Sequence, residues 1–152
     1  SISGHWEAER FTVSSSARPP MIYDYYNFPP HTCRIQYPAA GSPEVAHRIR
    51  ALLAGAGIEC DEDPERGFDH GTFVPLALIY PQAEVPVVSL SLRTSLDARE
   101  HLAAADAAGN DAGQRVLLDR VWGIAMASYA FGATAEPTIA RASRAGDVEL
   151  PA

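Results

Sequence analysis

The chain has 152 residues, 47% of them hydrophobic, and its 12 basic residues, all Arg, stand against 19 acidic ones for a net charge of −7. A chain of this length supports one domain whose core needs neither a metal nor a disulfide for stability, and the acidic balance excludes a protein that binds the nucleic-acid backbone through a basic stripe. No window approaches 18 consecutive apolar residues and the first residues form no basic, apolar leader, so we expect neither a membrane span nor secretion.

The N-terminal part predicts two strands followed by a long loop. Residues 1–6 and 11–13 are short β-prone segments, and the polar Glu-Ala-Glu-Arg between them is either a turn or a strand extension. Residues 19–43 are rich in proline, which excludes a continuous helix, and they also carry five aromatic side chains. Because a solvated loop does not normally hold so many aromatic residues, we expect this loop to pack on the body or to line a pocket.

A helix over 42–56 is predicted next. Ser42 suits the N-cap, Pro43 suits the first helical position, and Gly57 stops the helix. The predicted apolar stripe of this helix consists of Val45, Ile49, Leu52, Leu53 and Ala56.

The centre of the chain predicts two further strands. Residues 58–60 predict a short strand and 61–66 a charged turn. Residues 73–80 are apolar but contain Pro75, so both a helix and a strand remain open for them. The nearly continuous apolar run at 86–92, rich in β-branched residues, is typical of a buried strand.

The last part of the chain predicts an Ala-rich helix over 97–108, a second helix over 112–121 after a Gly-Asn break, and a strand over 123–131. Strands that alternate with helices predict an α/β fold: one domain over 1–132, with a central, mostly parallel or mixed sheet flanked by helices. The small and polar residues at 133–152 predict a mostly unstructured tail.

Histidines are the main candidates for chemistry, because the sequence has no phosphate-binding glycine loop, Cys-x-x-Cys pair or Gly-x-Ser-x-Gly elbow. His5 is predicted at the end of a strand, where ligand sites collect in α/β sheets, and a neutral imidazole there is a ligand for Fe(II) or Zn(II). His70 lies in Gly-Phe-Asp-His-Gly, where Asp69 could orient its ring. From the residues alone, a structural role at a strand edge or in a turn is the more common one for both histidines.

The other polar candidates lie on predicted loops, turns or polar helix faces, where solvation is the usual role. They are His31, His47, His101, Glu7 and Asp24, of which Glu7 and Asp24 could be general acids or bases. Cys33 has no histidine partner at a fixed spacing that would make it a nucleophile. Cys33 and Cys60 could be bridged, but two thiols in an ordinary composition are more typical of a cytoplasmic protein.

Five motifs occur together and in a familiar order. They are Ser-Gly-His-Trp-Glu at 3–7, Ile-Tyr-Asp-Tyr-Tyr-Asn-Phe-Pro-Pro at 22–30, Tyr-Pro-Ala-Ala-Gly-Ser-Pro-Glu at 37–44, Gly-Phe-Asp-His-Gly-Thr-Phe-Val-Pro-Leu at 67–76 and Val-Pro-Val-Val-Ser-Leu-Ser-Leu at 85–92. Through them the chain resembles the DOPA-dioxygenase type of class III extradiol ring-cleavage dioxygenases, which is related to the catalytic subunit of protocatechuate 4,5-dioxygenase. The likeness resumes at 111–116 and at 123–132.

The resemblance implies an enzyme that opens a catechol-type aromatic ring with O₂ at a non-haem Fe(II), or Zn(II) in some members. It implies that His5, in the His-Trp motif, binds the metal, and that His70, in the Asp-His-Gly motif, lines the pocket and hydrogen-bonds the substrate or oxygen. The expected partners are a small catecholic molecule and O₂, and a homo-oligomer is left open.

The chain also departs from the family pattern. Family members begin with a strand that leads to a His-Gly motif with another metal ligand. They also carry a central Gly-Ser-Gly and His-Asn stretch that contributes the presumed catalytic base, followed by a Glu-His-Leu-Leu-Pro-Leu motif with the remaining ligand. We expect the first strand and the central region to be lacking here. Glu100-His101-Leu102 could be a remnant of the second motif, although it fits a helix better. Because one His does not hold a catalytic iron, the alternative is a truncated or inactive relative that acts as a binding module through the aromatic loop 23–37.

Overall fold

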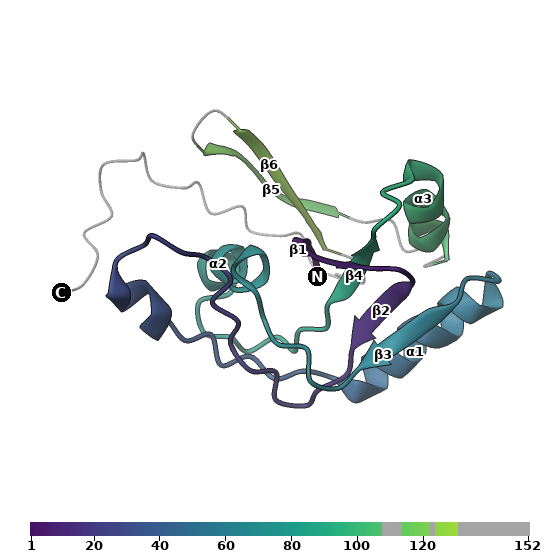
Figure 1. The fold of residues 1–152 in the computed structure, drawn as a ribbon, viewed down its shortest axis with the longest axis horizontal. Helices are drawn as coiled ribbons and strands as arrows, with labels where there is room; N and C mark the ends of the chain where they lie inside the picture. The colour runs from purple at the N-terminus through teal and green to yellow at the C-terminus, as the bar shows by residue number, and fades with distance from the viewer. Residues whose placement is uncertain (108–113, 122–123, 131–152) are drawn as a thin grey trace. The chain divides into compact units, whose positions relative to one another are not determined.

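The computed structural model describes residues 1–107, 114–121 and 124–130. The chain divides into two compact units, Ser1–Ala108 and Gly109–Ala152. Within the described residues, the first unit holds a four-stranded sheet and its helices, and the second holds a two-stranded sheet (Figure 1).

The sheet of the first unit is mixed and has the strand order β1-β4-β2-β3. β1 (Ile2–Ala8) pairs in parallel with β4 (Leu90–Arg93), and β2 (Phe11–Ser14) pairs in parallel with β3 (Cys60–Asp63). The two pairs meet where β2 and β4 run antiparallel. A mixed sheet with helices confirms the predicted α/β fold class, whereas the predicted tail lies outside the described residues.

α1 (Pro43–Gly55) begins and ends as predicted. Ser42 Oγ accepts a hydrogen bond from Val45 N, and Gly57 has a φ of 76° after the last turn. The helix packs on β2 and β3 and buries Ala46 and Leu53. Val45 and Leu52 of the predicted stripe are instead 46% and 43% exposed. The buried face therefore includes Leu53 of the predicted stripe and Ala46 beside it.

β3 lies at an edge of the sheet and consists largely of acidic residues. The charged turn predicted at 61–66 is wrong in its first half, because Asp61, Glu62 and Asp63 are paired with β2. Charged side chains are tolerated at a sheet edge, where they discourage pairing with another chain. Arg50 of α1 compensates part of this charge, with Nη1 donating to Glu62 Oε2 at 2.7 Å.

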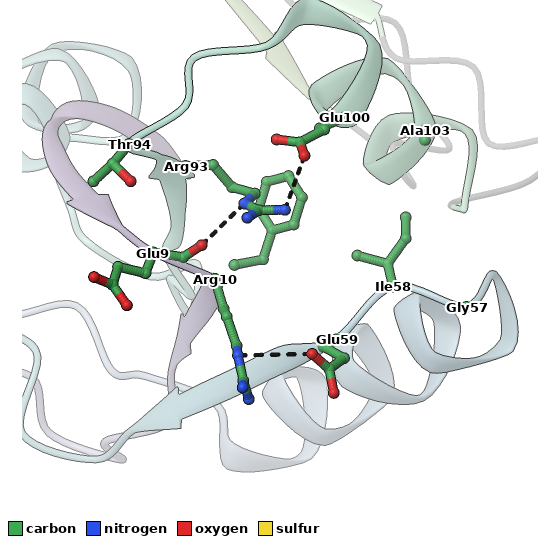
Figure 2. A pocket seen from close by; sticks show the side chains of 10 residues that line it. Glu9, Arg10, Gly57, Ile58, Glu59, Arg93, Thr94, Glu100 and Ala103 are labelled. Carbon is green, nitrogen blue, oxygen red and sulfur yellow. Dashed lines mark hydrogen bonds and ion pairs between the residues drawn. The ribbon is translucent and has the colours of Figure 1, made fainter.

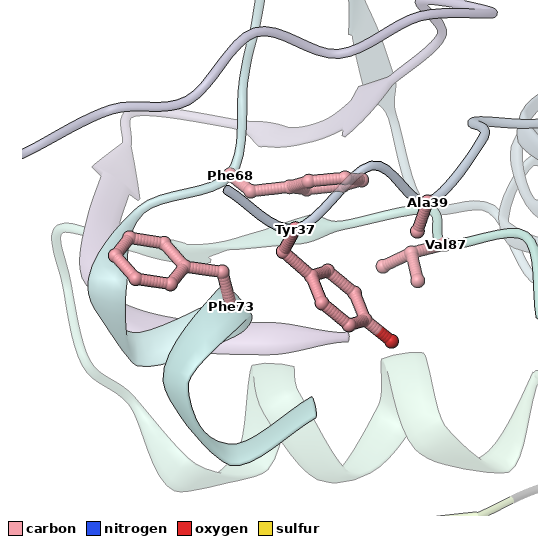
Figure 3. Close-up of a cluster of buried hydrophobic side chains, with 5 residues drawn as sticks. All are labelled: Tyr37, Ala39, Phe68, Phe73 and Val87. Carbon is pink, nitrogen blue, oxygen red and sulfur yellow. The ribbon is translucent and has the colours of Figure 1, made fainter. Parts of the chain in front are cut away.

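The loop between β2 and α1 contributes to the core, which confirms the prediction that it packs on the body. Its Tyr37 and Ala39 are buried in one cluster with Phe68, Phe73 and Val87 (Figure 3). Within the loop, a short 3-10 helix, η1 (Pro30–Arg34), is the only element that the structure describes.

Backbone hydrogen bonds tie this loop to the segment that precedes the next helix. Phe68 N donates to Pro20 O and Ile22 N donates to Phe68 O, both at 2.8 Å. The close approach requires a glycine, because a Cβ on Gly67 would overlap Pro20 O. The loop residues that follow Ile22 are thereby held beside the start of that helix.

α2 (His70–Ile79) shows that the ambiguous segment at 73–80 is largely helical, with Pro75 inside the helix. The helix packs on β1 and buries Phe73 in the core cluster. Its sequence is apolar on all sides, so Val74 and Leu78 remain 44% and 76% exposed.

β4 begins four residues later than the strand predicted at 86–92, because Val87 leaves the sheet and joins the core cluster. α3 (Ala98–Asp106) confirms the predicted helix over 97–108, with Asp97 as its N-cap. Among the described residues, none of the helices combines the length and the apolar composition needed to cross a bilayer.

In the second unit, β5 (Gln114–Val121) and β6 (Ile124–Ala130) pair antiparallel. β6 confirms the strand predicted over 123–131. The helix predicted over 112–121 is wrong, because this segment forms β5. Pairing with β6 outweighs the local helical pattern, since strand preference depends strongly on the partner strand.

Candidate metal and acid–base site

β1 presents His5 from an irregular stretch of the strand. Ile2 pairs with Leu90 and Glu7 with Leu92, so β1 has extra residues between these two points. His5 N donates to Ser3 Oγ at 3.2 Å within this stretch. A bulge bends a strand and redirects its side chains, and bulges are common next to active sites. His5 was predicted at the end of a strand, but it lies inside β1. Its side chain is 46% exposed.

The first turn of α2 places His70 beside His5. The ring centroids of the two histidines are 4.0 Å apart, and the ring planes are inclined by 48°. Gly71 allows this approach, because a Cβ there would overlap Ser3 Oγ and come within 2.9 Å of His5 Cδ2. The two histidines that the sequence singled out are thus brought together.

Asp24, from the loop between β2 and α1, joins the two histidines. Its Oδ1 accepts a hydrogen bond from His70 N at 3.0 Å and lies 2.7 Å from His70 Nδ1. Its Oδ2 lies 3.5 Å from His5 Nδ1. Burial raises the pKa of Asp24, but the hydrogen bonds from the backbone and ring of His70 outweigh this effect and hold the pKa below its usual value.

From the sequence, Asp24 could be a general acid or base, but solvation was the favoured role for a charged residue beside a turn. Its contact with His70 is not visible in the sequence, because the two residues are 46 positions apart. The signal that could have found it is its place in an aromatic, proline-rich loop that was predicted to line a pocket. Asp69 was considered instead as the partner of the His70 ring. It serves as the N-cap of α2, with Oδ1 accepting from Thr72 N at 2.9 Å.

The three side chains form a group that could hold a metal ion. Ligand atoms of His5, Asp24 and His70 all lie within 4.8 Å of one another. Imidazole and carboxylate groups suit Fe(II) and Zn(II). Within the described part of the chain, the His5 ring makes no hydrogen bond, so its nitrogen lone pair is available to a metal.

A second set of contacts supports the backbone on both sides of the site. Asp69 Oδ2 accepts a hydrogen bond from Arg66 Nη2, and both side chains are largely buried. The Arg66 guanidinium lies 4.7 Å from the centre of the Trp6 ring. Since Trp6 follows His5 and Asp69 precedes His70, this cluster connects the two segments that carry the histidines.

Aromatic side chains of the loop form one wall of the site. The Tyr25 ring meets the His70 ring edge-on at 5.5 Å, and Phe28 lies 5.4 Å from Tyr25. Tyr25 Oη donates to Thr32 O at 2.6 Å, which holds the ring in place. Tyr26 and Phe28 are 84% and 57% exposed.

The other sequence candidates are engaged elsewhere or exposed. His101 was expected to be solvated, but its Nδ1 lies 2.8 Å from Asp97 O and its Nε2 accepts from Arg93 N at 3.2 Å. Both ring nitrogens are therefore used, and the ligand remnant considered for His101 is not part of this site. His47 lies 3.7 Å from Glu62 at the surface.

The remaining candidates do not join the site either. His31 and Glu7 are exposed. Cys33 and Cys60 are both free thiols, so the bridge that the sequence left open is not formed.

A separate pocket of about 680 Å³ lies between the β1–β2 turn, the end of α1 and α3 (Figure 2). Both arginines of its lining are already paired: Arg93 Nη1 lies 3.0 Å from Glu100 Oε1, and Arg10 Nε lies 3.7 Å from Glu59 Oε2. Its lining contains neither a histidine nor a cysteine. The histidine group on β1 and α2 is therefore the better candidate for chemistry.

Comparison with known proteins finds a family that the chain matches over more than half of its length. A family model described as the catalytic LigB subunit of aromatic ring-opening dioxygenase matches residues 2–107, which include all three side chains of the group. The chain is 43% identical over 102 residues to the dioxygenase tasH of Hapsidospora irregularis, covering 66% of this chain and 32% of that protein.

Two plant relatives carry the same printed name, 4,5-DOPA dioxygenase extradiol. The protein of Beta vulgaris is 45% identical over 101 residues, covering 66% of this chain and 38% of the relative. The protein of Portulaca grandiflora is 38% identical over 117 residues, covering 76% of this chain and 43% of the relative. The chain thus spans roughly a third to two fifths of the length of these relatives.

Proposed function

This chain belongs to the family of the catalytic LigB subunit of aromatic ring-opening dioxygenases, and we propose that it takes part in the O₂-dependent extradiol opening of a catechol-type ring at a bound metal ion. The observation that carries the proposal is the group of His5, Asp24 and His70. Relatives named 4,5-DOPA dioxygenase extradiol support a small aromatic diol and O₂ as the partners.

His5 is the proposed metal ligand, with Fe(II) as the metal and Zn(II) as the alternative. The donor set fits: His5 Nδ1 and Asp24 Oδ2 are 3.5 Å apart, and two ligands on a tetrahedral metal are about 3.4 Å apart when each lies about 2.1 Å from it. Fe(II), when bound, supplies the redox chemistry that lets O₂ react with an aromatic ring. The resemblance implies further ligands from motifs that these 152 residues do not contain.

His70 is the acid–base residue that we propose for this chain, since the central segment with the family's presumed base is not among these 152 residues. Its ring stands beside His5, and within the described residues its Nε2 makes no hydrogen bond. A neutral imidazole nitrogen next to a metal ligand can take the proton of a diol hydroxyl when the ring of the substrate reacts. Tyr25 and Phe28 offer an aromatic wall against which that ring can pack.

One observation favours the second candidate function, a catalytically silent binding module. Tyr26 and Phe28 expose aromatic surface in the loop between β2 and α1, and such side chains are enriched at protein interfaces. Two free thiols support a cytoplasmic location for either function.

Metal content separates the two functions. We expect the protein reconstituted with Fe(II) under anaerobic conditions to retain metal, and His5→Ala to lose most of it, because the open imidazole is removed. Mass spectrometry measures the number of metal ions bound per protein chain, and the yellow ring-opened product of a catechol reports turnover. His47→Ala is the matched control, since His47 lies at the surface beside Glu62.

The enzyme assignment is wrong if the Fe(II)-loaded protein forms no ring-opened product. The ligand assignment is wrong if His5→Ala retains as much metal as His47→Ala.

A further inference from the structure

Asp24 Oδ1 makes two contacts with the same residue, one with the backbone N of His70 and one with its ring. The distances are 3.0 Å to His70 N and 2.7 Å to His70 Nδ1. We propose that Asp24 is the positioning residue of His70: it keeps the ring proton on Nδ1 and leaves the Nε2 lone pair open to the site. This inference rests on the proposed acid–base role of His70.

The tautomer follows from hydrogen-bonding chemistry. An ionised carboxylate only accepts hydrogen bonds, so the ring nitrogen 2.7 Å from Asp24 Oδ1 must donate. A neutral imidazole carries one ring proton, and a proton on Nδ1 makes Nε2 the acceptor. Nε2 is then in the form that takes a proton from a substrate hydroxyl.

The double contact also fixes the orientation of the ring. His70 is the first residue of α2, and its N–H has no partner inside the helix. Because Asp24 accepts from both this N–H and the ring, the ring cannot turn without losing a bond. Tyr25 lies edge-on to the ring at 5.5 Å and His5 lies at 4.0 Å, which leaves little room for another orientation.

Asp24 itself is held by the loop that carries it. Ile22 N donates to Phe68 O at 2.8 Å, and Met21 forms a bridge with Phe68, one residue before Asp69. The loop and the start of α2 are thus joined two residues before Asp24. An acceptor fixed in this way is pre-organised and needs no rearrangement when substrate arrives.

The geometry argues against a site in which Asp24 and His70 Nδ1 are both metal ligands. A nitrogen that carries a proton cannot bind a metal, and the 2.7 Å contact is a hydrogen bond. The contact of Asp24 with His5 is longer, at 3.5 Å. The Asp24 carboxylate therefore contacts both rings: Oδ1 accepts a hydrogen bond from His70, and Oδ2 faces His5.

Nuclear magnetic resonance of histidine-¹⁵N-labelled full chain, free of metal, tests the proposal. Long-range ¹H–¹⁵N spectra distinguish the two tautomers of a neutral ring, at a pH where the nitrogen shifts of His70 report the neutral form. We expect the Nδ1-protonated pattern for His70 in the wild-type chain and its replacement by the mixed pattern of a free imidazole in Asp24→Ala. Asp61→Ala, which removes an exposed carboxylate of β3, should leave the pattern unchanged.

Kinetics of the metal-loaded protein give a second readout. Counted per bound metal ion, so that any loss of metal is taken into account, kcat of Asp24→Ala should fall about 10- to 100-fold with little change in KM, as is typical when a partner of an active-site group is removed. An Nε2-protonated His70 in the wild-type chain, or an unchanged pattern in Asp24→Ala, overturns the proposal. So does a titration with zinc chloride that replaces the Nδ1 proton of His70 by metal.

If Asp24→Ala fails to fold, the tautomer of His70 in the wild-type chain still tests the proposal by itself. If the wild-type chain shows the expected tautomer but no ring-opening activity, the proposed function is wrong. The proposal that Asp24 positions the His70 ring is then unaffected.

Discussion

Gly71 is the residue that allows α2 to lie against β1 at the two histidines. A methyl group in its place would overlap Ser3 Oγ and come within 2.9 Å of His5 Cδ2. Ser3 is buried and also accepts a hydrogen bond from His5 N, so it has little freedom to move aside. A change at this one position therefore affects both the packing of α2 and the orientation of His5.

We expect Gly71→Ala to reduce the free energy of unfolding by about 1–3 kcal/mol, the usual cost of overpacking, and to lower metal retention. Urea denaturation measures the first effect and bound-metal analysis the second. Gly55→Ala is the control, because a Cβ on Gly55 meets nothing within 4 Å at the end of α1. It should leave metal retention unchanged and raise stability by up to about 1 kcal/mol. Equal stability of the two variants would contradict the steric role of Gly71.

At the scale of elements, the start of α2 depends on Asp69. Its Oδ1 caps the helix through Thr72 N and its Oδ2 binds Arg66, which in turn lies over Trp6 of β1. Asp69 is only 2% exposed. The same side chain therefore begins the helix, compensates the charge of a largely buried guanidinium and connects α2 to the strand that carries His5.

Two aspartate caps allow this role to be measured. Asp69→Ala should lower the free energy of unfolding by about 3–5 kcal/mol, because it leaves the largely buried Arg66 without its partner. Asp97→Ala removes the exposed cap of α3 and should cost only about 1 kcal/mol. Asp69→Asn keeps a capping side chain without the charge and should fall between them. Similar losses for Asp69→Ala and Asp97→Ala would show that the ion pair contributes little.

Elements with strong local signals could be predicted, and those that depend on a partner could not. Ser42 and Pro43 mark the start of α1 in the sequence and in the structure. The acidic residues of β3 predict a turn because their strand form depends on pairing with β2 at a sheet edge. β5 was predicted as a helix for the same reason, since its pairing with β6 is not visible in a local pattern.

The candidate site could also be predicted only in part. His5 and His70 stood out through sequence motifs that resemble those of a known family. Asp24 could not be assigned, because its hydrogen bonds to His70 exist only after the loop has folded back on the start of α2. The place of His5 within the strand was also missed, since a bulge in β1 leaves no clear mark in the hydrophobic pattern.

At the scale of the whole molecule, the described side chains that form the candidate site lie in the unit Ser1–Ala108. The four-stranded sheet, the buried aromatic cluster and the group of His5, Asp24 and His70 are all inside it. The match to the family model ends at residue 107, at nearly the same place. A unit with its own sheet and its own core is expected to fold without the rest of the chain.

We therefore expect a fragment of residues 1–108 to unfold cooperatively in urea and to show the same His70 tautomer as the full chain. Trp6 is the only tryptophan in that fragment; it follows His5 in β1 and its ring lies against the Arg66 guanidinium, so its fluorescence reports on the packing beside the site. Coincident transitions by Trp6 fluorescence and far-ultraviolet circular dichroism would show one cooperative unit. A gradual transition, or a His70 signal that differs from that of the full chain, would show instead that residues beyond 108 are needed to form the site.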